Sequence, residues 1–153
     1  YDDRWPEPFR IVQNRGTGML ITGDRGWRDY TVTADVTPHL AAAAGLAARV
    51  QGLRRFYAVE LVARDTVRLR RGVQVLAEHP FPWTYGHTYR LMVECHADRI
   101  RAGVDGAVLL DVRDSAYDGG GVALSITEGR TATQHVRVTP TADREPDPDR
   151  SRN

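Results

Sequence analysis

Lysine is absent from this chain of 153 residues, so all 21 of its basic residues are arginines. Without lysine, the chain has no side-chain amine for Schiff-base chemistry and cannot complete a phosphate-binding P-loop. The formal net charge is only +1, which provides no general basic field for nucleic acid or an anionic membrane. A membrane-spanning helix needs about 20 consecutive apolar residues, and no apolar run in this chain approaches that length. We therefore expect no nucleic-acid partner and no membrane partner.

Cysteine is nearly absent as well. Cys95 is the single cysteine, so no disulfide can form within the chain. Its apolar strand pattern predicts a core position rather than a nucleophile. The first residues show no charged segment followed by an apolar one, as a secretory signal would, and we expect the chain to be a module of a larger protein. The cytosol and secretion both remain open, with the cytosol preferred.

Helical signals are also scarce. Only the four alanines at 41–44 favour a helix, and the flanking Pro38 and Gly45 limit it to a turn or two. The rest of the chain consists of short apolar stretches between regular turn signals, with no 40-residue repeat of the propeller type. At 41% hydrophobic residues, the composition supports a packed core. The predicted fold class is all-β, a two-sheet antiparallel β-sandwich of the jelly-roll type.

Alternation of apolar and polar residues predicts the individual strands. Residues 29–37 alternate cleanly, which is the period of a half-buried strand. The end of the chain, 141–153, is polar and charged, so we predict a sandwich domain over 1–140 followed by a disordered tail or linker. The other predicted strands include 9–14, 18–22, 45–51, 54–63, 87–97, 99–104, 107–112, 120–127 and 133–139.

One predicted hairpin has a register that can be checked by its faces. A two-residue turn at Gly52-Leu53 pairs 45–51 with 54–63, and a slip by one residue would mix the two faces. In this register the side chains of Arg49, Phe56 and Glu60 lie together on the outer face.

Two further turns are predicted. A turn around Asp65 would bring Arg70 opposite Glu60, as a cross-strand ion pair on the outer face. Asp105-Gly106 is the strongest short hairpin signal of the chain.

The order of these features resembles a known sandwich superfamily. Residues 26–32 (GWRDYTV) resemble the strand opening of concanavalin-A-like lectin/glucanase domains. Residues 45–49 (GLAAR) and 56–61 (FYAVEL) resemble the hairpin of the laminin-G-like and levan-binding branches. Residues 86–91 (GHTYRL) and 104–106 (VDG) follow in the order typical of such domains. The resemblance implies a fold that hosts enzymes, lectins and interaction modules.

Two stretches show a narrower resemblance. Residues 33–38 (TADVTP) and 45–55 (GLAARVQGLRR) resemble the sandwich module appended to actinobacterial ADP-ribosylglycohydrolase-family proteins. This resemblance implies an accessory module that is covalently linked to a catalytic domain. The metal-binding aspartate motifs of that other domain are absent here, so no catalytic residue carries over.

The glutamates give little support for catalysis. Glucanases of this fold place two glutamates close together on one strand, whereas no two of the six glutamates here lie within five residues. Glu60 and Glu94 are the best candidates for a pair that meets across strands. We therefore expect no catalytic residue, and a glycoside hydrolase remains an alternative.

A ligand-binding surface is the stronger expectation. Sugar sites combine an aromatic ring with planar polar groups, and a guanidinium can pack beside such a ring. The alternatives are a solvated charged face, a face covered by a partner domain and, for Trp83, a plug at the end of the sandwich; Trp27 is expected in the core. The candidate ligand-binding residues are Arg49, Phe56, Glu60, Arg68, Arg70, Trp83 and Tyr85.

Calcium is the one cofactor that the sequence leaves open. The loop from Asp111 to Asp118 contains three aspartates, and Ca²⁺ takes six to eight oxygen ligands. The same aspartates could simply form turns. The candidate calcium ligands are Asp111, Asp114 and Asp118.

The expected function is a non-catalytic module that binds a glycan or a nucleotide sugar beside a larger enzyme. The arginine-rich outer face would suit an anionic ligand such as ADP-ribose. A structural module that docks a partner domain without a ligand is the second alternative.

Overall fold

The computed structural model describes the backbone of residues 4–5, 9–22, 27–52 and 54–140. All regular elements in these residues are β-strands, so the predicted all-β fold is confirmed. The described part of the chain contains no helix long and apolar enough to cross a bilayer. The predicted tail, 141–153, lies outside the described residues. The strands are β1 (Arg4–Trp5), β2 (Phe9–Thr22), β3 (Tyr30–Gly52), β4 (Arg55–Val62), β5 (Thr66–Arg71), β6 (Gln74–Pro80), β7 (Tyr89–His96), β8 (Arg99–Val104), β9 (Ala107–Arg113) and β10 (Gly121–Pro140).

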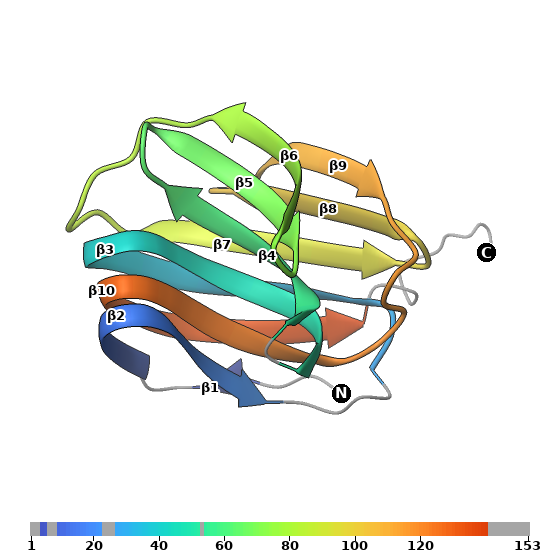
Figure 1. The fold of residues 1–153 in the computed structure, drawn as a ribbon. Helices are drawn as coiled ribbons and strands as arrows, with labels where there is room; N and C mark the ends of the chain where they lie inside the picture. Colours follow the sequence, from blue (N-terminus) through green and yellow to red (C-terminus); the bar gives the residue numbers. More distant parts are fainter. Residues whose placement is uncertain (1–3, 6–8, 23–26, 53, 141–153) are drawn as a thin grey trace.

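Two long strands, β3 and β10, run through both layers of the sandwich (Figure 1). Residues 30–36 of β3 pair with β7, whereas the part from Ala43 onward pairs with β4. β10 pairs with β3 along most of its length, and on its other side with β2 and β1. One layer therefore has the order β6-β5-β4-β3 and the other the order β9-β8-β7-β3, and both continue into β10. All pairings are antiparallel, as predicted.

The continuity of β3 corrects the prediction of two strands with a short helix between them. Residues 41–44 belong to a strand of 23 residues, because pairing with β10 and β4 outweighs the helix preference of alanine. Pro38 falls between the stretch of β3 paired with β7 and the stretch paired with β4. Its missing N–H therefore removes no hydrogen bond to either of these two strands. Likewise β2 and β10 are each one strand where two were predicted, and β1 and β6 were not predicted.

The core lies between the facing surfaces of the two layers. In β7 every second residue from Tyr89 to Cys95 is buried, which is the predicted alternation. The core position of Cys95 is confirmed, and burial raises the pKa of its thiol to about 12. Trp27 also packs against the core, with its ring edge-on to that of Tyr30 at 5.8 Å between centroids.

The predicted register of β3 against β4 is confirmed from Gly45 to Ala48 and fails beyond it. There β3 contains a bulge, and the ladder resumes at Gly52 two residues away from the predicted register. Arg49 lies in this bulge with a φ of 50°. The prediction that Arg49 faces outward beside Phe56 is wrong, because a bulge re-aims the side chains that it contains.

The turn between β4 and β5 is centred on Arg64 rather than Asp65, and both residues have positive φ angles of 68° and 52°. Glu60 is therefore opposite Arg68 rather than Arg70. A shift of two residues preserves the faces of a strand, so both arginines stay on the outer face with Glu60.

The hairpin at Asp105-Gly106 is confirmed. It joins β8 to β9, and the two residues have φ angles of 53° and 87°. Positive φ at both central positions is what a type I′ turn requires.

Candidate functional site

The bulge of β3 places a buried arginine, Arg49, at one end of the sandwich. Its side chain is 1% exposed. Its backbone N–H donates to the hydroxyl of Tyr30 at 2.6 Å, and this hydroxyl donates to the carbonyl of Gly120 at 2.7 Å. Gly120 has a φ of 145°, and a Cβ there would lie 2.5 Å from the carbonyl carbon of Arg49. The bulge and the start of β10 fit together because residue 120 is glycine.

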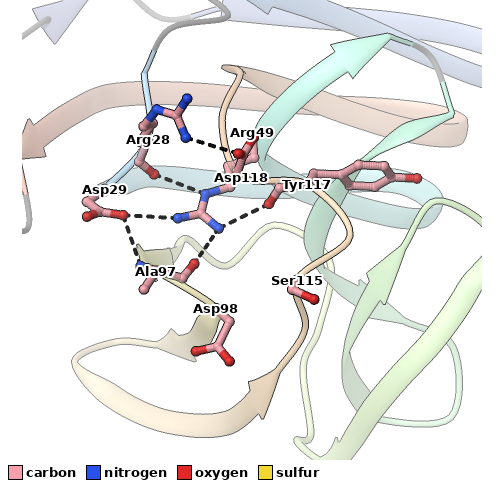
Figure 2. Close-up of a pocket in the computed structure, with 8 residues that line it drawn as sticks. All are labelled: Arg28, Asp29, Arg49, Ala97, Asp98, Ser115, Tyr117 and Asp118. Carbon is pink, nitrogen blue, oxygen red and sulfur yellow. Dashed lines mark hydrogen bonds and ion pairs between the residues drawn. The ribbon is translucent and has the colours of Figure 1, made fainter.

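The guanidinium of Arg49 joins three segments that are far apart in the sequence (Figure 2). Its Nε donates to the carbonyl of Arg28, just before β3, at 3.0 Å. Its Nη1 donates to the carbonyl of Ala97, in the β7–β8 turn, at 2.7 Å, and to that of Tyr117, in the β9–β10 loop, at 3.1 Å. Its Nη2 donates to Asp29 at 3.1 Å. Four of the five guanidinium N–H groups thus bind internal acceptors, which holds the three segments in fixed relative positions.

These segments surround a pocket with a volume of about 240 Å³, which we call the Arg49 pocket. Drug-sized sites have volumes of roughly 300–1,000 Å³, so this pocket suits a small molecule or a single unit of a larger one. The residues that line it are Arg28, Asp29, Arg49, Ala97, Asp98, Ser115, Tyr117 and Asp118 (Figure 2).

The charged side chains around the pocket form ion pairs with one another or with a neighbour. Arg28 lies 3.0 Å from Asp118, and Asp98 accepts a hydrogen bond from Arg113 at 2.7 Å. Ser115 is exposed, and its hydroxyl has no hydrogen-bond partner among the described residues. The pocket therefore offers carboxylate oxygens, a hydroxyl and the other N–H groups of Arg28 to a ligand.

A second network holds the β9–β10 loop that forms one wall. The hydroxyl of Tyr57 donates to Asp114 at 2.5 Å and accepts the N–H of Tyr117 at 3.2 Å, and Arg71 lies 2.5 Å from the other oxygen of Asp114. Burial and the neighbouring carboxylate raise the pKa of Tyr57. Burial alone would raise the pKa of Asp114, but the hydrogen bonds from Tyr57 and the N–H of Ala116, with the charge of Arg71, lower it. Asp114 is therefore an ionised anchor for the loop.

The outer face of β4 and β5 brings together four of the predicted ligand-binding residues. Glu60 is 1% exposed, and both its oxygens accept from Arg70 at 2.8 Å, while Arg68 donates to one of them at 2.9 Å. The guanidinium of Arg70 also lies over the ring of Phe56, 4.9 Å from its centroid. Because Phe56 is only 3% exposed, it presents no open aromatic platform.

The predicted aromatic pair lies in the β6–β7 loop. The indole of Trp83 donates to the carbonyl of Val62 at 2.7 Å and packs against the core. Tyr85 meets Trp83 edge-on at 5.4 Å and is 52% exposed. Trp83 is thus partly buried against the core, which favours a plug at the end of the sandwich, and its role in ligand binding stays a prediction.

The predicted calcium ligands do not come together. Among the described residues, no group of three or more His, Cys, Asp or Glu side chains is placed to hold a metal ion. Instead, the carboxylates of Asp111, Asp114 and Asp118 each bind a different guanidinium, those of Arg99, Arg71 and Arg28 respectively.

The candidate glutamate pair is also separated. Glu60 faces outward from β4, whereas Glu94 faces outward from β7 in the other layer and binds Arg101 at 2.6 Å. Packed sheets lie about 10 Å apart, so two carboxylates on opposite outer faces cannot reach one glycosidic bond. The expectation that these two could meet is wrong.

Most residues of the Arg49 pocket were not predicted from the sequence. Asp29, Asp98 and Ser115 look like ordinary residues of turns and strand ends. They come together because three connections meet at the same end of the sandwich (Figure 1). Their position at the ends of predicted strands was the one signal in the sequence that could have indicated a binding site, since loops on a rigid scaffold often carry binding residues.

Comparisons with known proteins show the fold. No family model matches the chain, and no curated protein matches it. Among solved structures, the carbohydrate-binding module CBM66 from Bacillus subtilis is 22% identical, with a TM-score of 0.66 over 88% of this chain and 83% of that one. A galectin from Caenorhabditis elegans is 13% identical, with a TM-score of 0.56 over 83% of this chain and 94% of that one.

A larger protein also contains a similar fold. A fructosyltransferase from A. japonicus is 12% identical, with a TM-score of 0.69 over 92% of this chain, which spans only 26% of that chain. At these identities the matches show architecture alone. The chain has a lectin-like β-sandwich fold, in agreement with the resemblance to concanavalin-A-like domains.

Proposed function

We propose that this chain is a non-catalytic carbohydrate-binding module whose ligand occupies the Arg49 pocket. The observation that carries the proposal is the pocket itself, a hollow of about 240 Å³ between three chain segments whose backbone carbonyls are held by a buried guanidinium. Preorganised polar groups suit the hydroxyls of one sugar ring, because little has to be ordered when the ligand binds. Two of the solved structures with this fold are a carbohydrate-binding module and a galectin.

The Arg49 pocket is a better candidate than the outer face of β4 and β5. On that face the predicted residues Glu60, Arg68 and Arg70 are bound to one another, and Arg70 lies over Phe56. A ligand there would first have to separate a buried ion pair, which is strongly unfavourable.

A wider hollow of about 440 Å³ is lined by Asp35, Thr88, Arg90, Asp105 and Gly106, and is also a weaker candidate. Its polar groups are largely engaged, since Arg90 binds both oxygens of Asp35 and its backbone N–H binds Asp105. The hydroxyl of Thr88 pairs with that of Thr37 at 2.6 Å.

An accessory role beside a catalytic domain is part of the proposal. The fructosyltransferase match, in which a similar sandwich is about a quarter of a longer chain, supports such an arrangement. The narrower resemblance to modules of ADP-ribosylglycohydrolase-family proteins receives no support from the structural neighbours reported above.

The test is titration calorimetry with a panel of neutral mono- and oligosaccharides, including fructans and galactosides. We expect Ser115→Trp to abolish binding, because the indole would fill the pocket from an exposed position. Val73→Trp, at a site 91% exposed on the β5–β6 turn, is the matched control for adding an indole. Binding that survives Ser115→Trp but is lost in Arg68→Gln would place the site on the outer face instead.

A docking module is the second candidate, and exposed apolar side chains favour it. Val73, Val75 and Val108 are exposed near the edge strands β6 and β9, which lie side by side (Figure 1). No binding of any sugar at millimolar concentration, by a chain that circular dichroism shows to be folded, would favour this candidate.

A further inference from the structure

We infer that the Arg49 pocket selects an uncharged, hydroxyl-rich ligand and rejects anionic ones such as nucleotide sugars, sugar phosphates and uronic acids. This inference rests on the proposed function of the pocket and names its ligand class. It reverses the expectation from composition, in which a chain rich in arginine would attract an anion.

The first step of the argument is that the cations at the pocket are already paired. The guanidinium of Arg49 is buried and lies 3.1 Å from Asp29, and that of Arg28 lies 3.0 Å from Asp118. Arg113, just outside the pocket, lies 2.7 Å from Asp98. The positive charge of each guanidinium is therefore already offset by a carboxylate, so an anion gains less at this pocket than it would from an unpaired arginine.

The second step concerns the acceptors that remain. Asp118 uses Oδ2 and Asp98 uses Oδ1 for these pairs, so among the described residues the second oxygen of each has no hydrogen-bond partner. The hydroxyl of Ser115 is similarly without a partner in the described part of the chain. In Figure 2 neither Asp98 nor Ser115 is joined to another labelled residue. Carboxylate oxygens accept hydrogen bonds and donate none, so the second oxygens of Asp98 and Asp118 call for a ligand group that donates.

The third step is the sign of the local charge. Three aspartates and two arginines line the pocket, and Arg113 brings the local charge to balance. A neutral sugar keeps this balance and gives its hydroxyl protons to the second oxygens of the aspartates. An anion brings an uncompensated negative charge beside three carboxylates, which is the kind of repulsion by which binding sites exclude a wrong ligand.

The experiment compares matched pairs that differ in charge but share a ring. Calorimetry on the full chain would use glucose with glucuronate, galactose with galacturonate, and fructose with fructose 6-phosphate, and ADP-ribose as a larger anion. We expect at least one neutral sugar to bind, and its anionic counterpart to bind at least tenfold more weakly. Equal or tighter binding of the anion would overturn the inference while leaving a sugar site in place. No binding by any member of any pair would overturn the proposed function, and this inference with it.

A pair of variants assigns the discrimination to the pocket. In Asp98→Asn the shape is kept but one carboxylate is removed and Arg113 is released, so we expect the preference for the neutral member to fall at least threefold. Asp111→Asn makes the same change at an aspartate that pairs with Arg99 on β9 and does not line the pocket, and the preference should be unchanged. An equal effect in both variants, or no effect in Asp98→Asn, would contradict the inference. Ser115→Ala should weaken the neutral sugar by roughly 2- to 12-fold, the range of one neutral hydrogen bond.

Discussion

Glu60 shows how a charged residue can be buried in a sandwich of this size. Its carboxylate receives three hydrogen bonds from the guanidiniums of Arg68 and Arg70. Burying a charge is tolerated only when it is paired and hydrogen-bonded, and the loss of one partner leaves the other uncompensated.

We therefore predict that Glu60→Gln destabilises the chain by about 3–5 kcal/mol, the range for breaking a buried ion pair by removing one partner. Urea unfolding would measure the change. Glu78→Gln, at an exposed position on β6, is the matched control and should stay within about 0.5 kcal/mol of the unmodified chain. Equal effects of the two substitutions would show that the ion pair contributes little.

Asp114 makes the stability of the chain depend on pH. Its pKa in the folded state is lowered, against the effect of burial, by hydrogen bonds from Tyr57 and the N–H of Ala116 and by the charge of Arg71. A lowered pKa stabilises the folded state fully above the pKa of the unfolded chain, near 3.9 for aspartate. That stabilisation is lost as the pH falls through the folded-state value.

At pH 7 we expect Asp114→Asn to be less stable by roughly 1.5–3 kcal/mol, the range for hydrogen bonds to a charged group. The difference from the unmodified chain should shrink as the pH falls from about 4 toward 2. Thermal unfolding at a series of pH values measures it. A difference that stays constant down to pH 2 would show that the charge of Asp114 is not responsible.

At the scale of secondary-structure elements, the bulge of β3 has the largest consequence. It takes Arg49 out of the outer face and places its guanidinium among three connecting segments. The bulge in turn depends on the close approach of Gly120, whose φ of 145° few other residues adopt.

We predict that Gly120→Ala is far more harmful than Gly86→Ala. Both glycines have positive φ angles, but a Cβ at Gly86 meets no atom within 4 Å, whereas at Gly120 it lies 2.5–2.7 Å from backbone atoms of the bulge. Gly86→Ala should cost about 1–2 kcal/mol, the strain of a left-handed residue. Gly120→Ala should exceed this by several kcal/mol or prevent folding.

Denaturant unfolding and ligand titration would check this prediction together. Gly86→Ala should keep the sugar affinity, while any folded fraction of Gly120→Ala should lose it because the wall of the pocket moves. Similar stabilities for the two variants would show that the packing around the bulge is loose.

At the scale of the whole molecule, β3 and β10 make the two layers interdependent. Each of these strands is hydrogen-bonded to strands of both layers. If one layer unfolded, the other would lose part of the strands that it shares with it. We predict a single cooperative unfolding transition, in which far-UV circular dichroism, near-UV circular dichroism and tryptophan fluorescence change together. Two separated transitions would show that the layers unfold independently.

Folding should also be slow for a domain of this size. β10 must pair with β2 and β3, which lie about a hundred residues earlier in the chain. Such distant pairings place refolding in the millisecond-to-second range typical of all-β proteins. Stopped-flow refolding in microseconds would contradict this picture.

The sequence by itself determined the fold class, the alternating core strands, the Asp105-Gly106 hairpin and the core position of Cys95. These features depend on local periodicity and turn chemistry, which a single strand or turn already expresses. It also placed Glu60, Arg68 and Arg70 on one face, because a two-residue error in register leaves the faces unchanged.

Only the tertiary structure decided the continuity of β3, the position of Arg49 and the pocket. The alanines at 41–44 are extended because strands β4 and β10 pair with them. Their partners in β10 lie more than 80 residues later in the chain, and no local signal records so distant a neighbour. Arg49 lies away from its predicted position because the bulge adds residues to the strand, and a regular alternating pattern does not indicate where a bulge occurs. The pocket joins residues from before β3, the β7–β8 turn and the β9–β10 loop. Their proximity is a property of how the strands are stacked, so it could not be predicted from the chain alone.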